Sequence, residues 1–276
     1  MCSSDLPDII TAPGPGGRAI RQTNHLKVFD GVTGAQVTDA FVNPIPFGEK
    51  YARGYNLVAG DFTGDGKVDL AVAPRGGLPT VVIIDGATHT ARPAMTVLPT
   101  TLPYRSGVRI AAGDVDGDGR PELIVAGGAR TKSLVRVLDG VTGQSVRPDF
   151  NPFGDLKFVG GGVHVAAGDV NGDGKADIIV GVMVGPPILR TFDGVTEASI
   201  GLLSPAQNTK FRSGIRVAAV DVNGDGVAEI ITATGRAARL KAQVERLDGT
   251  TFSVLDANPA DDTLVFKGGA FVSAGR

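Results

Sequence analysis

Residues 164–180 read HVAAGDVNGDGKADIIV: an apolar run, a loop rich in aspartate and glycine, and a second apolar run. Close variants of this stretch open at Asn56, Arg109 and Arg216. The first aspartate of the loop falls at positions 61, 114, 169 and 221, so the spacing is 52 to 55 residues. Self-similarity at a fixed period of this length indicates a repeat fold.

Each repeat predicts four β-strands. The first strand is the apolar segment before the acidic loop, and the second is a continuous apolar run such as 177–180. The third alternates, as in 135–137, and leads to an Asp-Gly turn that recurs at positions 30, 85, 139, 193 and 248. A weaker fourth strand leads to an aromatic residue and a glycine turn. Four antiparallel strands in about 50 residues are typical of a β-propeller blade. The predicted fold is therefore an all-β propeller of about five blades, with the alanine-rich first strand at the crowded inner edge.

The repeats also predict the domain organisation. We expect one propeller over residues 7–275, with units of approximately 7–54, 55–107, 108–162, 163–214 and 215–269, and with 270–275 completing the first unit. Residues 1–6, MCSSDL, fit no repeat and are interpreted as a cloning scar or a disordered start. The repeats begin with a strand that follows an acidic loop and end with one that precedes it. Two interpretations stay open and are compatible: a five-blade ring closed by pairing of the terminal strands, or a fragment of a larger propeller.

The acidic loops predict metal sites. In each nine-residue loop, side chains at positions 1, 3, 5 and 9 and the carbonyl at position 7 can converge on one hard cation, and glycine at position 6 permits the sharp turn. The candidate side-chain ligands are Asp61, Thr63, Asp65 and Asp69; Asp114, Asp116, Asp118 and Glu122; Asp169, Asn171, Asp173 and Asp177; and Asp221, Asn223, Asp225 and Glu229. The candidate carbonyls belong to Lys67, Arg120, Lys175 and Val227.

The ligand type favours calcium. Oxygen donors without histidine or cysteine argue against zinc, and six to eight oxygens favour Ca²⁺ over Mg²⁺. We expect about four Ca²⁺ sites with a structural role, the tightest at loop 114–122 because it has four acids, and a weaker one at loop 61–69. The alternative is a set of Asx-type turns, in which Asp and Asn side chains accept hydrogen bonds from backbone amides. Four loops in register favour calcium, because carboxylates at such density repel one another without a cation.

The loops, of pattern D-x-[DNT]-G-D-G-x-x-[DE], resemble the FG-GAP repeat of integrin α-subunit propellers and, more closely, the bacterial relatives called VCBS or FG-GAP-like repeats. The resemblance covers about residues 7 to 275. It implies a propeller with calcium between the first two strands of a blade, an extracellular or cell-surface location, and a role in adhesion or carbohydrate association. Two features depart from the integrin pattern: this chain has material for five blades rather than seven, and its first unit lacks the acidic loop. The first residues do not have the pattern of a signal peptide.

Charge suggests where a partner binds. The chain has 27 Lys and Arg against 29 Asp and Glu, a balance that does not favour a nucleic-acid partner. Because the acidic loops hold 13 of those acids, the rest of the chain is basic. The face opposite the loops is predicted to collect Arg18, Arg53, Arg75, Arg105, Arg130, Arg212 and Arg236, with Lys132 and Lys267. This candidate ligand face suits anionic glycans or acidic protein surfaces, and ordinary solvated loop charge is the alternative.

Arg109, His164 and Arg216 hold the same place in the first strand and are candidate channel residues, binding a ligand or simply tolerated in a water-filled channel. Catalysis is not predicted, because His25, His89 and His164 occupy unrelated repeat positions and no Ser or Cys nucleophile pairs with them.

The predicted function is a calcium-stabilised extracellular binding or adhesion module for carbohydrate or protein. The alternatives are a polysaccharide-active enzyme, such as a glycoside hydrolase or lyase, and a passive spacer. We expect a monomeric domain of a larger protein, without a membrane span because no apolar run approaches 18 residues.

Overall fold

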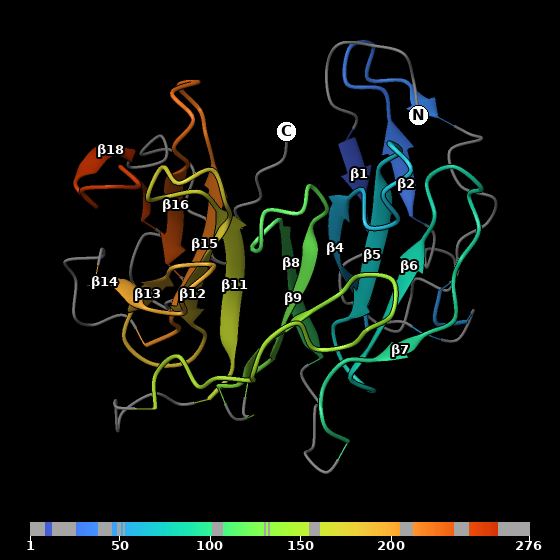
Figure 1. Cartoon of the computed structure of the whole chain (residues 1–276), viewed down its shortest axis with the longest axis horizontal. Helices are drawn as coiled ribbons and strands as arrows, with labels where there is room; N and C mark the ends of the chain where they lie inside the picture. The colour runs from blue at the N-terminus through green and yellow to red at the C-terminus, as the bar shows by residue number, and fades with distance from the viewer. Residues whose placement is uncertain are drawn as a thin grey trace.

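The computed structural model describes residues 9–12, 26–37, 46–48, 51, 53–100, 107–129, 131, 133–154, 161–204, 212–234 and 243–258. Within these residues the chain forms five antiparallel sheets of three or four strands, arranged as a five-bladed β-propeller (Figure 1). The all-β prediction and the blade number are thus confirmed. None of the described residues forms a helix long and apolar enough to cross a membrane.

The strands follow one another in space as they do in sequence, so each blade is a meander. Blade 1 holds β1 (Ile9–Thr11), β2 (Lys27–Phe29) and β3 (Gln36–Val37). Blade 2 holds β4 (Tyr55–Gly60), β5 (Asp69–Pro74), β6 (Thr80–Ile84) and β7 (Met95–Thr96). Blade 3 holds β8 (Val108–Gly113), β9 (Glu122–Gly127) and β10 (Val135–Leu138). Blade 4 holds β11 (Val163–Gly168), β12 (Asp177–Val182), β13 (Leu189–Phe192) and β14 (Ser199–Leu203). Blade 5 holds β15 (Ile215–Val220), β16 (Glu229–Thr234), β17 (Val244–Leu247) and β18 (Val254–Asn258).

The predicted fourth strand is the least regular element of a blade. It spans two residues in β7 and five in β14 and β18. In blade 3 two isolated bridges, Val135 to Phe150 and Leu138 to Ser145, take its place. The predicted closing strand at 270–275 and the start at 1–6 lie outside the described residues.

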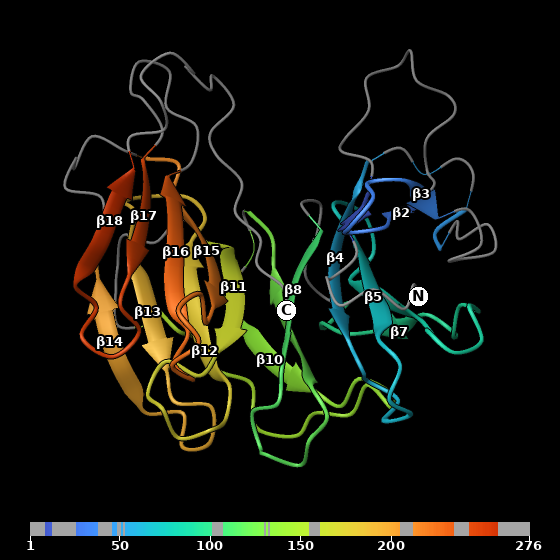
Figure 2. The ribbon, with the colours of Figure 1, turned by 90° about the horizontal axis from the view of Figure 1, so that it is seen from above.

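The first strand of blades 2 to 5 lies at the inner edge of its sheet. Strands β4, β8, β11 and β15 contact one another in succession, and Figure 2 shows β15 inside and β18 outside in blade 5. Small residues permit this crowding. A Cβ atom added to Gly113 would lie 2.6 Å from the Cβ of Ala176 in the next blade. The alanine-rich segment therefore lies where it was predicted.

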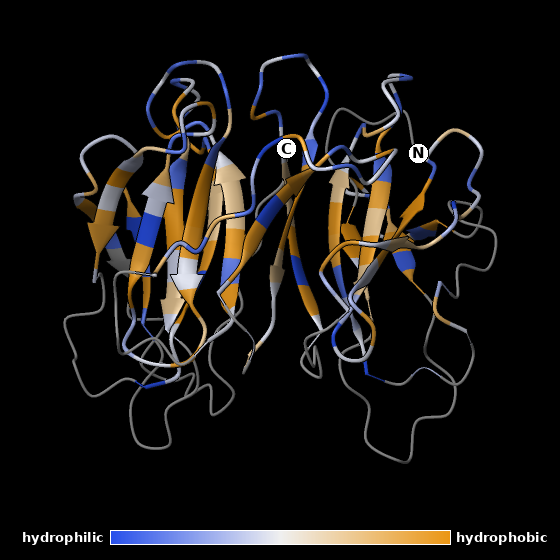
Figure 3. Cartoon of the chain, turned by 60° about the horizontal axis from the view of Figure 1, so that its bottom comes forward, coloured by the Kyte–Doolittle hydropathy of each residue, from blue (hydrophilic) through white to orange (hydrophobic). Residues whose placement is uncertain are grey.

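The core lies between successive blades. Every residue of β5, β9 and β12 is buried, as expected for strands that are apolar on both faces. One apolar cluster joins Val115 and Ile124 of blade 3 to Val163 and Ile178 of blade 4, and similar clusters join blades 1 to 2, 2 to 3 and 4 to 5. Apolar residues predominate in the strands, although several strands also carry hydrophilic positions, and hydrophilic residues are frequent in the loops (Figure 3). This packing fixes the hairpins that carry the acidic loops.

Candidate metal centre

Each acidic loop joins the first two strands of its blade. The strand ends that flank the loops are paired: Gly60 with Asp69, Gly113 with Glu122, Gly168 with Asp177, and Val220 with Glu229. Position 9 of each loop is thus the first residue of a buried strand. This acidic residue is at most 6% exposed in all four blades, which is rare for an acid without compensating partners.

Backbone amides supply part of that compensation. The N–H of Val115 donates to Glu122 Oε2 at 2.9 Å, and that of Val170 donates to Asp177 Oδ2 at 2.9 Å. The other oxygen of Asp177 accepts from the N–H of Gly194, in the Asp-Gly turn of the same blade, at 3.0 Å. Position 9 therefore ties the acidic loop to the Asp-Gly turn, and both lie at one end of the blade.

Position 1 organises the loop itself. Asp169 accepts from the N–H of Gly172 at 2.6 Å with Oδ1 and from the N–H of Gly174 at 2.7 Å with Oδ2. Both glycines have left-handed φ angles, +79° and +84°, which residues with a Cβ rarely adopt. These are the hydrogen bonds of the Asx-type alternative. They are compatible with a cation, because an ionised carboxylate has about four acceptor positions.

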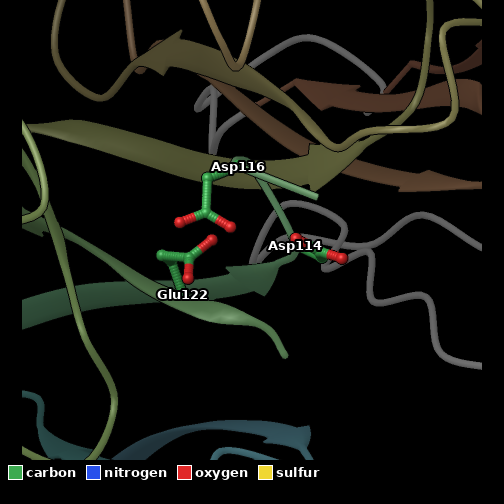
Figure 4. A group of neighbouring side chains, drawn as sticks. All are labelled: Asp114, Asp116 and Glu122. Carbon is green, nitrogen blue, oxygen red and sulfur yellow. The ribbon is translucent and has the colours of Figure 1, made fainter. Parts of the chain in front are cut away.

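Three acids converge in loop 114–122. The ligand oxygens of Asp114, Asp116 and Glu122 lie within 4.8 Å of one another, with the carboxylates of Asp116 and Glu122 facing each other in Figure 4. Burial and the neighbouring carboxylates of Asp116 and Asp114 raise the pKa of Glu122 to about 7, against a lowering by the bond from Val115. Asp118, the fourth predicted ligand, instead forms an ion pair with Arg120 at 3.0 Å.

Loop 169–177 also has a buried carboxylate with a raised pKa. Burial raises the pKa of Asp177 to about 6, helped by the carboxylates of Asp173 and Asp193. The amide of Asn171 donates to Asp193 at 3.1 Å and to Asp177 at 3.3 Å. Asp193 belongs to the Asp-Gly turn, so this turn contributes an acid that the sequence analysis did not include among the ligands.

Loop 221–229 is held in the same way. The amide of Asn223 donates to Asp225 and to Oε1 of Glu229, both at 2.9 Å. The side chains that the sequence pattern grouped at positions 3, 5 and 9 are thus neighbours in this loop as well.

Loop 61–69 carries an uncompensated polar atom. The Oγ1 of Thr63 is buried, and within the described part of the chain it has no hydrogen-bond partner. A buried hydroxyl without a partner is costly, and a bound cation would satisfy its oxygen. The carboxyl, amide and hydroxyl oxygens of all four loops are the donors that a hard cation prefers, so the residues present fit calcium.

The loops of successive blades touch one another, which the repeat pattern alone did not predict. Lys175 at position 7 donates from Nζ to the carbonyl of Asp116 in the preceding loop, 2.9 Å away. Arg120 covers Gly64, where an added Cβ would lie 2.7 Å from its Cδ. One sequence signal could have suggested this contact: position 7 is basic in three of the four loops.

Backbone bonds reinforce the contact between loops. The N–H of Ala176 donates to the carbonyl of Asp114 at 2.8 Å, and that of Ala228 donates to the carbonyl of Asp169 at 2.6 Å. The equivalent residue in blade 3 is Pro121, which has no N–H to donate. The acidic face is therefore a chain of linked loops rather than a set of separate sites.

The opposite end of the blades carries the candidate ligand face in part. Arg53 and Arg212 are exposed there and Arg75 is partly buried. The remaining residues predicted for this face, Arg18, Arg105, Arg130, Lys132, Arg236 and Lys267, lie outside the described residues. The candidate channel residues Arg109, His164 and Arg216 are each the second residue of an inner strand, opposite Ala126, Gly181 and Ala233. They lie toward this same end, away from the acidic loops.

Two stretches of the chain match the model of a known repeat family. Residues 61–125 and 114–180 each match the family model described as FG-GAP-like repeat. Residues 61–180 thus contain FG-GAP-like repeats. The first match runs from the acidic loop of blade 2 to strand β9, and the second from the loop of blade 3 to strand β12. Each FG-GAP-like match thus contains two of the loops described above. No curated protein matches the sequence.

The solved structures that match are only distantly similar. U3-55K is 11% identical with a TM-score of 0.49, over 84% of this chain and 60% of that chain. The WD40 repeats of RRP9 are 11% identical with a TM-score of 0.49, over 84% and 59%. The rhamnogalacturonan lyase PL11 of Bacillus licheniformis is 12% identical with a TM-score of 0.46, over 91% and 64%. This chain spans less than two thirds of the length of each, and similarities of this size carry no argument about function.

Proposed function

We propose that this FG-GAP-like propeller is a calcium-stabilised extracellular binding module whose acidic loops hold about four Ca²⁺ ions. The observation that supports the proposal best is the convergence of Asp114, Asp116 and Glu122 within 4.8 Å. Three carboxylates at that separation repel one another, and this repulsion adds to the effect of burial in raising the pKa of Glu122. A divalent cation at the loop would supply the missing positive charge.

The proposed role of the cation is structural. The carboxylates at position 9 are attached to the inner hairpin and, in blades 2 and 4, to the Asp-Gly turn through Gly86 and Gly194. A cation shared by these carboxylates would therefore hold the hairpin and the turn together. Extracellular calcium modules bind with Kd of about 10⁻⁴ to 10⁻³ M, so an extracellular setting would keep such sites filled.

The proposed ligand is a carbohydrate or protein that binds the face opposite the acidic loops, where Arg53 and Arg212 are exposed. Exposed guanidinium groups favour anionic groups on a partner. An array of sulfated and neutral glycans tests this proposal, which requires a salt-sensitive preference for the sulfated ones. Absence of that preference would leave the arginines as ordinary solvated charge and the module as a spacer.

The absence of enzymatic activity stays a prediction. His89 lies in a turn, where its N–H donates to the carbonyl of Asp85, and His164 lies in an inner strand. His25 lies outside the described residues. Most of the closely spaced acids belong to the loops assigned to calcium, so no free acid and base pair is proposed.

The variant Asp116→Asn tests the calcium proposal. It removes one charge from the converging group while keeping the size of the side chain, so calcium binding at this loop should weaken by about tenfold or more. Isothermal titration calorimetry measures the loss. The matched control is Asp149→Asn, which removes a charge that pairs with Arg136 at 2.7 Å, and it should bind calcium as the parent does. Equal calcium binding by the two variants would contradict the assignment of this loop.

A further inference from the structure

A group of basic side chains meets where the inner strands begin. Arg109 of β8, His164 of β11 and Arg216 of β15 occupy the same register, second in each strand. Arg75 follows the last residue of β5, which pairs with the first residue of β4, so it lies at the same end of its blade. These four residues come from four consecutive blades. Strands β8, β11 and β15 contact one another in succession, so Arg109, His164 and Arg216 lie along one end of the inner edge of the blades.

Charge interactions also link the four groups. The charges of Arg75 and Arg216 both act on Arg109, and Arg75 also acts on Arg216. Burial, followed by Arg109, Arg216 and Arg75, lowers the pKa of His164 to about 3, so its imidazole is neutral at pH 7. Burial, followed by the charges of Arg75 and Arg216, lowers the pKa of Arg109 to about 10. Three guanidinium groups are thus gathered beside a neutral imidazole.

The fold itself does not require arginine at this register. The equivalent residue of β4 is Asn56, whose Nδ2 donates to the carbonyl of Val108 in the neighbouring inner strand at 2.5 Å. A short neutral side chain thus fills the position and bonds the next blade. Arginines at two of the other three positions, joined by Arg75 from a different strand, bring together like charges that repel one another. A ligand of opposite charge would reverse that repulsion.

We propose that this end of the inner strands binds an oxyanion, sulfate-like or carboxylate-like, through the guanidinium groups of Arg75, Arg109 and Arg216. Planar guanidinium groups match the paired oxygens of such anions and can donate two parallel hydrogen bonds to them. The neutral imidazole of His164 supplies a further N–H donor without adding charge. The site lies at the opposite end of the inner strands from the acidic loops, so it does not rest on the calcium proposal.

Sulfate is the first probe, measured against chloride at equal ionic strength on the full chain with calcium present. We expect saturable heat on titration and a rise of the melting temperature that chloride does not produce. Arg109→Gln and Arg216→Gln should each weaken sulfate binding by about tenfold or more. The control is Arg92→Gln, whose guanidinium pairs with Asp85 at 3.3 Å beside the Asp-Gly turn, and it should bind sulfate as the parent does.

Arg109→Lys keeps the charge and removes the planar fork, and it should show an intermediate loss. This variant keeps the test decisive if Arg109→Gln does not fold. Glucuronate distinguishes the sources of the ligand: comparable binding identifies an acidic sugar, whereas binding of sulfate alone identifies a free inorganic anion, and both support the site. Equal responses to sulfate and chloride would overturn the proposal, as would equal sulfate binding by Arg109→Gln and Arg92→Gln. A protein that binds sulfate but not calcium would leave this site standing while the calcium proposal fails.

Discussion

At the scale of single residues, His164 shows how an inner strand can hold a titratable group in its neutral form. Its lowered pKa, about 3 against an ordinary 6.5, follows from burial and from three neighbouring arginines. Between these two values the unfolded chain binds a proton that the folded protein does not. Stability from this group is therefore present above pH 6.5 and is lost as the pH falls toward 3.

The variant His164→Gln should remove that loss. Between about pH 6 and pH 4 the free energy of unfolding of the parent should fall more steeply than that of the variant, by up to about 1.4 kcal/mol per pH unit. Urea unfolding at several pH values in chloride buffer measures both slopes. At pH 7.5 and above the two proteins should differ by a constant offset. Parallel curves across the acidic range would show that His164 takes up a proton in the folded state as readily as in the unfolded chain.

At the scale of the element, the Asp-Gly turn packs directly against the acidic loop of the same blade. Gly194 approaches the loop so closely that an added Cβ would lie 1.9 Å from the carbonyl oxygen of Ala176. Its N–H also donates to the buried Asp177. Glycine is thus required by the packing of the two turns.

Gly194→Ala should consequently lower the free energy of unfolding by about 2 to 4 kcal/mol, because backbone must move to admit the methyl group. Gly154→Ala is the matched control, since the nearest atom to its added Cβ is 3.4 Å away, and it should change stability by less than about 1 kcal/mol. Chemical denaturation compares the two. Similar stabilities would show that the turn and the loop are not in contact.

The elements also show how far the sequence predicts the molecule. Strand type and loop position follow from local patterns, because a run such as 177–180 is apolar at every residue and the acidic loop interrupts it at a fixed place. Contacts between repeats do not follow from such patterns. The bond from Lys175 to Asp116 and the meeting of Arg75 with Arg216 join residues about 60 and 140 positions apart. They depend on how neighbouring blades are turned toward each other.

The same limit explains why only some of the predicted ligands of the candidate site come together. The sequence grouped four acids in loop 114–122, and the structure brings three of them together while Asp118 turns to Arg120. A spacing rule assigns each side chain to a position in the loop, but the choice between a carboxylate neighbour and a nearby guanidinium depends on rotamers. Asp193 was missed for a related reason, since it comes from the next turn of the blade.

At the scale of the whole molecule, the blades are linked on the acidic face from loop to loop. The N–H of Ala176 and that of Ala228 each donate to the first aspartate of the preceding loop, and Lys175 adds a side-chain bond. Apolar clusters join the same blades beneath. Calcium at these loops would therefore stabilise contacts between blades as well as within them.

A calcium titration followed by thermal melts with and without chelator tests most directly whether the acidic loops bind calcium. Four loops that bind calcium at millimolar concentration or below should raise the melting temperature as calcium is added, and chelator should reverse the gain. The stabilisation should reach about 2.7 kcal/mol for each site at a free calcium concentration of 100 times its Kd. No binding at millimolar calcium, together with a melting curve that chelator leaves unchanged, would contradict the assignment of the acidic loops.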